Sequence, residues 1–343
     1  HKLCELRPDA SHQQIAEIEL EQQVSLIGDE YSPLVDVNGL PCWPSDPLYD
    51  QIEQHQAALL QEHDIHLESL WSNWPAIYRQ ATGSSLPHIT LRAGIDFDQI
   101  VFGLSVASLA HVAQPLLAIS KPLQQCSENV AAVATQAYQL WMNKDLQGIG
   151  WSYPGDHGEE PVLSGFTEPF DTWASMNQLL CRETWPSGHE PKNIAYFCNA
   201  FALKDYPPSS DDGFPARCAD VVKATAINQL QTQIGALWTQ VGEHGFPWDW
   251  LVDSAGGSGV ARFDSQFWRA NIDPSERYVL SLVDTSIYRL RADQSGFSNL
   301  FLAGDWLKTG LDAGCVEAAV MGGMQASRAI CGLPETIRGE QGW

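Results

Sequence analysis

The sequence predicts a mixed α/β fold, and three segments carry this prediction. The segment NLFLAGDWLKTGLDAGCVEAAVMGGMQASRAI, from Asn299 to Ile330, begins as a strand and continues as a helix. The segment FDQIVFGLSV, at 97–106, is nearly all apolar and rich in β-formers, as strands covered on both faces are. The segment at 219–238 carries apolar residues at helical spacing, which predicts a long amphipathic helix.

The other elements follow from local pattern. HKLCEL and QIAEIEL alternate in part and predict a hairpin, whereas the proline-rich stretch at 31–52 predicts irregular structure. We expect helices at 51–80, 108–119 and 130–141, and strands at 141–155, 194–201, 266–272 and 278–283. In the helix that ends the quoted segment, Val316, Val320 and Met324 recur at i, i+4 and i+8, which predicts an inner stripe. The small residues Gly322, Gly323, Ala326 and Ala329 would let that helix lie close to a sheet.

Composition excludes several classes of function. The 343 residues include 42 acidic and 19 basic ones, for a formal charge of −23. A field of that sign repels phosphate backbones and anionic lipid surfaces, so we expect no nucleic-acid partner and no membrane-surface binding. The apolar stretch at 100–119 is interrupted by Ser105, Gln114 and Pro115, so we expect a buried strand and helix there and no transmembrane segment.

The cysteine pattern bears on metals and on cellular location. None of the eight cysteines forms a C-x-x-C pair or joins a short Cys/His cluster, so we assign no metal site. In a long chain without a secretory leader we expect reduced thiols and a cytoplasmic location.

The joint between strand and helix, near Gly304 and Asp305, is the strongest candidate site. A helix N-terminus presents unpaired N–H groups and a partial positive charge, which favour electron-rich oxygen. Asp305 ends the strand, where ligands of open α/β sheets bind, and its carboxylate suits hydroxyl donors better than phosphate. The pattern indicates a polyol on Asp305 and a carbonyl-bearing ring over the helix start; a joint packed for stability alone is the alternative.

The full string NLFLAGDWLKTGLDAGCVEAAVMGGMQASRAICG resembles the C-terminal flavin-contacting motif of the amine oxidase and phytoene desaturase superfamily of FAD-dependent oxidoreductases. The resemblance implies an incomplete Rossmann-like FAD-binding domain with an inserted substrate domain. It implies that Asp305 binds the ribityl chain and that the N–H groups near Cys315 and Val316 face the flavin pyrimidine edge. The positions that match the motif, and that we assign to FAD binding, are Gly304, Asp305, Trp306, Gly314, Cys315 and Val316. The implied reaction passes a hydride from a C–H bond of a small-molecule substrate to flavin N5, and we assign no catalytic side chain.

The sequence departs from the family at one point. The family opens with a strand and G-x-G-x-x-G, which seats the FAD diphosphate, and this sequence has no such opening. The nearest string, GGSGVAR at 256–262, follows no convincing strand, and we interpret it as a loop. We therefore expect the C-terminal part of a longer enzyme or half of a split one, with the dinucleotide-binding segment elsewhere in the protein or in a partner chain. The rival hypothesis is a non-catalytic flavin-fold fragment or binding subunit.

The resemblance also implies a division of the chain. We expect residues 1–110 and 286–334 in the FAD-binding domain, 111–285 in the substrate domain and 335–343 as a tail. A few further residues allow two interpretations each. Cys315 could serve redox chemistry or simple packing, and Arg289 and Arg291 could bind cofactor or substrate or lie on a solvated edge. Trp268, Tyr278 and Tyr288 could line an aromatic substrate cage or belong to the ordinary core. We assign no chemical role to His157, His189 and His244.

Overall fold

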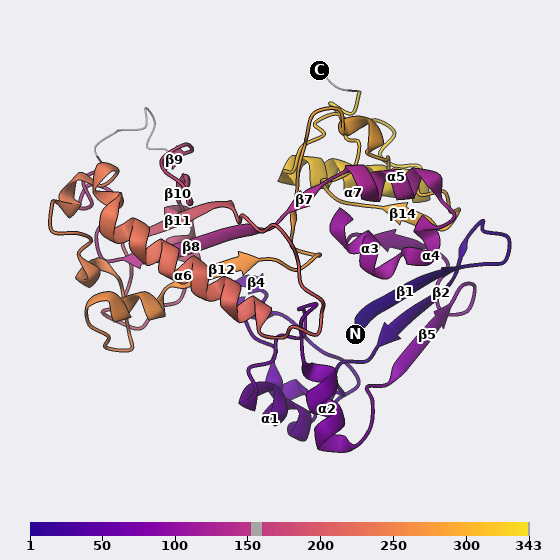
Figure 1. Ribbon diagram of the computed structural model, residues 1–343, viewed down its shortest axis with the longest axis horizontal. Helices are drawn as coiled ribbons and strands as arrows, with labels where there is room; N and C mark the ends of the chain where they lie inside the picture. The colour runs from indigo at the N-terminus through magenta and orange to yellow at the C-terminus, as the bar shows by residue number, and fades with distance from the viewer. Residues whose placement is uncertain (152–159, 342–343) are drawn as a thin grey trace. The chain divides into compact units, whose positions relative to one another are not determined.

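The structure is a computed structural model that describes residues 1–151 and 160–341, and it confirms a mixed α/β fold with several sheets (Figure 1). The chain divides into two compact units. Unit 1 comprises His1–Asp29, Tyr49–Val133 and Ile272–Trp343, and unit 2 comprises Glu30–Leu48 and Ala134–Asn271. The boundaries lie elsewhere than at 110 and 286, because helices after 108 pack on the first strand and residues after 272 pair with the segment before 133.

Unit 1 is built on three small sheets. The expected hairpin is confirmed, and a third strand extends it into an antiparallel sheet of order β1 (Lys2–Pro8), β2 (Ile15–Glu21) and β5 (His88–Arg92). Strand β14 (Leu300–Leu302) pairs in parallel with β6 (Ile100–Phe102), and β13 (Tyr278–Val279) pairs with β7 (Ala132–Val133). The α-helices of this unit are α1 (Gln54–Glu62), α2 (Trp74–Thr82), α3 (Leu109–Val112), α4 (Gln114–Leu117), α5 (Lys121–Asn129) and α7 (Val316–Cys331).

The core of unit 1 joins the first hairpin to strand β14. Leu300 and Leu302 are almost fully buried, in a cluster that also contains Leu6 and Ile15. The buried amide of Asn299 accepts from the Ile15 N–H (2.8 Å) and donates to the Ile15 carbonyl (2.9 Å). This two-way bond satisfies backbone groups that the bulge end of β1–β2 leaves inside the core.

Unit 2 is an antiparallel sheet with one long helix. The strand order is β12 (Phe267–Asn271), β8 (Thr135–Met142), β11 (Asn193–Ala200), β10 (Thr172–Ser175) and β9 (Val162–Leu163). Helix α6 (Phe214–Thr232) lies along this sheet (Figure 1) and packs on β8 and β12. The Tyr138 hydroxyl donates to Gln229 Oε1 (2.7 Å), and Gln229 Nε2 donates to the Phe170 carbonyl (3.0 Å), so these two polar side chains are paired inside the aromatic core.

Several elements differ from the prediction. The helix expected at 130–141 is wrong: the segment forms β7 and most of β8, whose alternating side chains pack into the unit 2 core. The strand expected at 97–106 shrinks to Ile100–Phe102, and Val101 is 53% exposed, so this strand is not covered on both faces. The helix expected at 108–119 is broken into α3 and α4, with Pro115 in the first turn of α4.

Other segments also differ from the prediction in where their helices and strands begin and end. The helix expected at 51–80 is two helices, and the strand expected at 278–283 has only two residues, Tyr278–Val279. The stretch at 31–52 contains a short hairpin, β3 (Val35–Val37) and β4 (Leu40–Cys42), whose two-residue turn is Asn38-Gly39 with both φ angles positive. Of the strand expected at 141–155, only the first two residues belong to a strand, and 152–155 lie outside the described residues, as does His157.

Two further observations concern the whole described chain. All eight cysteines are free. Within residues 1–151 and 160–341, no helix combines the length and apolar character needed to cross a membrane.

Candidate functional site

The candidate site is the turn that connects β14 to α7. The strand and the helix are adjacent in one unit, and the strand pairs in parallel with β6, which lies within the segment at 97–106. Their closest approach is at two glycines: a Cβ added to Gly322 would lie 2.6 Å from the Gly304 carbonyl oxygen. The helix therefore lies directly on the turn that follows the strand.

The start of α7 offers main-chain donors. Cys315 is the N-cap, and its Sγ accepts from the Ala318 N–H at 3.4 Å. The N–H groups of Val316 and Glu317 have no intrahelical acceptor, as in every helix start. The Val316 side chain is 76% exposed, so the first turn is open to a ligand.

The Asp305 carboxylate is half-buried and lacks a side-chain partner. Within the described ranges, no side chain donates a hydrogen bond to it; its own backbone N–H and the Arg289 charge are its stabilising neighbours. Burial raises the pKa of Asp305, and the backbone N–H and Arg289 oppose this shift. A half-buried carboxylate with free lone pairs is suited to accept hydrogen bonds from the hydroxyls of a ligand.

The buried side chain of Arg289 holds the main chain at Asp305. Its side chain is 2% exposed, and it donates to the carbonyls of Asp305 (2.9 Å) and Leu280 (3.2 Å) and to Ser281 Oγ (3.1 Å). Burial lowers the pKa of Arg289, and the nearby carboxylates counter that effect. Arg291, the other arginine considered from the sequence, pairs with Glu340 (2.8 Å).

Trp306 and Gly304 form the inner side of the turn. Trp306 is 1% exposed, and its indole N–H donates to the Leu104 carbonyl (3.1 Å). Gly304 has φ 143°, and a Cβ there would lie 2.7 Å from the Trp306 ring. The turn thus requires glycine at 304, and Trp306 fills the interior beside it with almost no surface left for a ligand.

Tyr278 lies on the joint, which the sequence did not indicate. Its hydroxyl donates to the Gly314 carbonyl, and a Cβ on Gly314 would come within 2.6 Å of its ring. Its side chain is 47% exposed, and its pKa is raised by burial and by the nearby Asp305 and Cys315. The chain separation of 36 residues left no local signal for this contact.

The stripe expected to face inward on α7 faces outward. Val316, Val320 and Met324 are 76%, 51% and 41% exposed, whereas the buried residues are Ala318, Met321, Gly322, Gln325 and Ala326. The contact with Gly304 explains this orientation, because a face that carries glycine at 322 can lie that close to the turn. Gly322 and Ala326 belong to that face, but Gly323 and Ala329 do not.

The string at 256–262 is a loop and a 3-10 turn, which confirms its interpretation. Asp253 accepts from the N–H groups of Ala255 (2.8 Å) and Gly257 (2.5 Å) and from Ser265 Oγ (2.6 Å). The loop therefore encloses a carboxylate of its own, and these N–H groups are not free for phosphate.

The aromatic candidates belong to different units. Trp268 belongs to unit 2, where Lys223 lies over its ring at 4.8 Å, whereas Tyr278 and Tyr288 belong to unit 1. The segment at 335–343 is not a free tail over its described part. Ile337 is 8% exposed, and Glu340 pairs with Arg291 and Arg328.

Comparison with known proteins adds little to this geometry. No protein-family model matches the chain, and no curated protein matches it. Among solved structures, it is similar to an oxidoreductase from Methanosarcina mazei, with 12% identity, a TM-score of 0.40, and coverage of 70% of this chain and 45% of that one. The chain thus spans less than half the length of that structure, and a likeness at this level carries no argument about fold or activity.

Proposed function

We propose that this chain is the flavin-contacting part of an FAD-dependent oxidoreductase of the amine oxidase and desaturase type. When bound, FAD would supply the acceptor for a hydride that leaves a C–H bond of a small-molecule substrate. The chain's own residues would bind and orient the cofactor: Asp305 would hold the ribityl hydroxyls, and the Val316 and Glu317 N–H groups would face the pyrimidine carbonyl.

The observation that carries the proposal is the half-buried Asp305 carboxylate without a side-chain donor. It lies near the Tyr278 hydroxyl, which also lies near Cys315 at the start of α7. A single ligand that carries hydroxyls at one point and a carbonyl at the next would satisfy both the carboxylate and the free N–H groups. The ribityl-isoalloxazine portion of a flavin has this arrangement.

The diphosphate of FAD would need a separate site. In the glycine-rich loop at 256–262, the N–H group of Gly257 already donates to Asp253, as does that of Ala255 just before it. We propose that a dinucleotide-binding segment, in the same protein or in a partner chain, supplies this site. The 343-residue chain alone would then bind FMN and FAD weakly and with similar affinity, since its own contacts stop at the ribityl chain.

The test is amide NMR of the chain titrated with FMN and with FAD. We expect shifts at the Val316 and Glu317 amides. In the Asp305→Ala variant the affinity for both flavins should fall by roughly tenfold to a hundredfold, since each charge-assisted hydrogen bond contributes about 1.5–3 kcal/mol. Cys315→Ala is the matched control, because it leaves the main-chain donors in place.

Two results would contradict the proposal. If FMN leaves the amides of Val316 and Glu317 unmoved, the helix start does not face a flavin. If the Cys315→Ala variant loses as much affinity as the Asp305→Ala variant, the carboxylate does not have the assigned role. FAD that binds far more tightly than FMN would place a phosphate site within this chain.

A further inference from the structure

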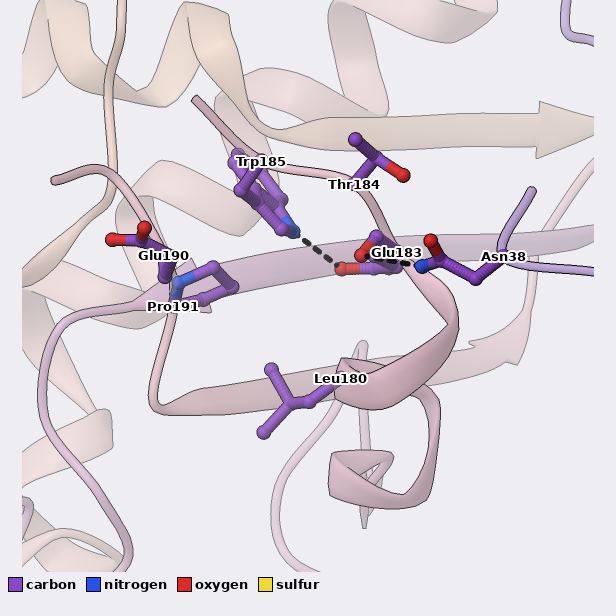
Figure 2. A pocket seen from close by; sticks show the side chains of 7 residues that line it. All are labelled: Asn38, Leu180, Glu183, Thr184, Trp185, Glu190 and Pro191. Carbon is purple, nitrogen blue, oxygen red and sulfur yellow. Dashed lines mark hydrogen bonds between the residues drawn. The ribbon is translucent and has the colours of Figure 1, made fainter. Parts of the chain in front are cut away.

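Unit 2 contains a cavity of about 290 Å³ that has no part in the function proposed above. Figure 2 shows its lining: Glu183 and Asn38 lie on one side, Glu190 and Pro191 lie on the other, and the Trp185 indole lies between the two carboxylates. The lining residues are Asn38, Leu180, Glu183, Thr184, Trp185, Glu190 and Pro191.

The Glu183 carboxylate is held in place by two indoles. The Trp141 N–H donates to both of its oxygens, at 3.0 Å and 2.9 Å, and the Trp185 N–H donates to Oε2 at 2.9 Å (Figure 2 shows the Trp185 bond). The two indole rings lie 5.7 Å apart. Indole N–H groups are neutral, so they orient this carboxylate without neutralising its charge.

The second carboxylate, Glu190, is also without a cation. Its Oε2 accepts from the Gly188 N–H at 2.9 Å. Within residues 1–151 and 160–341, neither Glu183 nor Glu190 forms an ion pair. The cavity thus concentrates two negative charges beside an aromatic wall, in a chain whose formal charge of −23 already attracts cations.

The hairpin turn completes the rim. Asn38 donates to the Glu183 carbonyl at 3.4 Å, and the positive φ angles of Asn38 and Gly39 are those of a tight two-residue turn. The Asn38 amide oxygen is left as an additional acceptor. Glu183, Glu190, Asn38 and Thr184 therefore each bring an oxygen to the rim, and the Asn38 amide and the Thr184 hydroxyl can also donate.

We propose that this cavity binds an organic cation, a guanidinium or ammonium group on a short apolar stem. The carboxylates would pair with the charge, the Trp185 ring would stack on it, and Leu180 and Pro191 would contact the stem. A metal ion fits the lining poorly, because hard cations need about six oxygen ligands and half of this wall is apolar. The volume of about 290 Å³ lies at the lower end of the range for small-molecule pockets, which suits a small group rather than a large ligand.

The experiment uses the whole chain without flavin, so its failure leaves the proposed function untouched. The probes are butylguanidinium and its neutral isostere butylurea, and the readout is the indole N–H signals of Trp141 and Trp185, assigned with Trp185→Phe. A capped Gly-Arg-Gly peptide distinguishes a side chain of another protein from a free cation. The variants are Glu183→Gln and Glu190→Gln, and the matched control is Glu335→Gln, an exposed carboxylate of unit 1.

We expect butylguanidinium to shift both indole signals and to bind at least about tenfold more tightly than butylurea, the effect of one charge-assisted hydrogen bond. Each cavity variant should remove most of that preference, whereas Glu335→Gln should keep it. Glu190 is exposed and does not anchor an indole, so its variant tests the proposal even if Glu183→Gln unfolds. Equal binding of the two probes, or an unchanged preference in Glu190→Gln, would overturn the proposal. Tighter binding of the peptide identifies a protein side chain as the source of the cation, and weaker binding identifies a free molecule.

Discussion

Two adjacent glycines of α7 should respond in opposite directions to the same substitution. Gly322 faces the turn after β14, where a Cβ would lie 2.6 Å from the Gly304 carbonyl oxygen, 3.1 Å from its nitrogen and 3.3 Å from Leu307 Cδ1. Gly323 is exposed, and a Cβ there would have no atom within 4 Å. Gly322→Ala and Gly323→Ala therefore add the same methyl group to the same helix in two different environments.

The magnitudes follow from these distances. Replacing a mid-helix glycine by alanine stabilises by about 0.5–1 kcal/mol, and Gly323→Ala should show this gain undiminished. At Gly322 the helix would have to move away by about 0.8 Å, the difference between an ordinary 3.4 Å contact and 2.6 Å. Overpacking of this kind costs about 1–3 kcal/mol. We expect Gly322→Ala to destabilise unit 1, and the two variants should differ by the overpacking cost of about 1–3 kcal/mol.

The assay is urea unfolding combined with hydrogen exchange of the α7 amides, because two compact units can give two transitions. The exchange data assign the change to α7. If Gly322→Ala proves as stable as Gly323→Ala, the helix does not approach Gly304 closely, and the geometry described for the candidate site is wrong.

Three further predictions test the groups around the joint. Asp305→Asn should stabilise the chain at pH 7 by less than about 1 kcal/mol, since burial raises the pKa of this half-exposed carboxyl and water screens the effect. The raised pKa stabilises the folded wild type below the ordinary pKa of 3.8, and this stabilisation is lost as the pH rises. Urea unfolding should therefore show a smaller gain for Asp305→Asn at pH 4 than at pH 7, and an equal gain at both pH values would contradict the assignment. Glu340→Gln should destabilise by about 1–3 kcal/mol at pH 7, because Arg328 holds the pKa of Glu340 below its ordinary 4.5; thermal unfolding should show this loss shrinking as the pH falls, and a pH-independent loss would refute the pairing. Arg289→Lys should destabilise by about 1–3 kcal/mol and speed hydrogen exchange at 304–306, because lysine cannot span the three acceptors, and unchanged exchange would show that Arg289 does not fix the turn.

The strand and helix of the candidate site could be predicted because their signals are local. A glycine and an aspartate, Gly304 and Asp305, follow the strand closely, and the helix is capped by Gly332, which has the left-handed conformation common after helix ends. Their adjacency also followed from the order of elements in an α/β unit. The buried face of α7 could not be predicted from apolar spacing, because close approach to Gly304 selects small residues over Val316, Val320 and Met324.

Residues brought in from elsewhere in the chain could not be predicted. Tyr278 reaches Gly314 across 36 positions, and only the folded chain brings them together. The segment at 130–141 shows the same limit in secondary structure. Its spacing fits a helix, but pairing of β8 with β11 and β12 on its two edges makes it a central strand.

The groups that fix the joint are different from those that would meet a ligand. Arg289 holds the Asp305 main chain, Trp306 fills the space beside Gly304, and Gly322 lets α7 lie on the turn. None of these side chains is open to a ligand, yet each sets where the Asp305 carboxylate and the Val316 N–H lie. A site of this kind depends on geometry held by buried neighbours, because a shift of about 1 Å is enough to misplace a hydrogen bond. Loss of ligand binding in Gly322→Ala with the Asp305 carboxylate intact would therefore support the joint as a built site, whereas intact binding would mean that the ligand-facing groups tolerate the displaced helix.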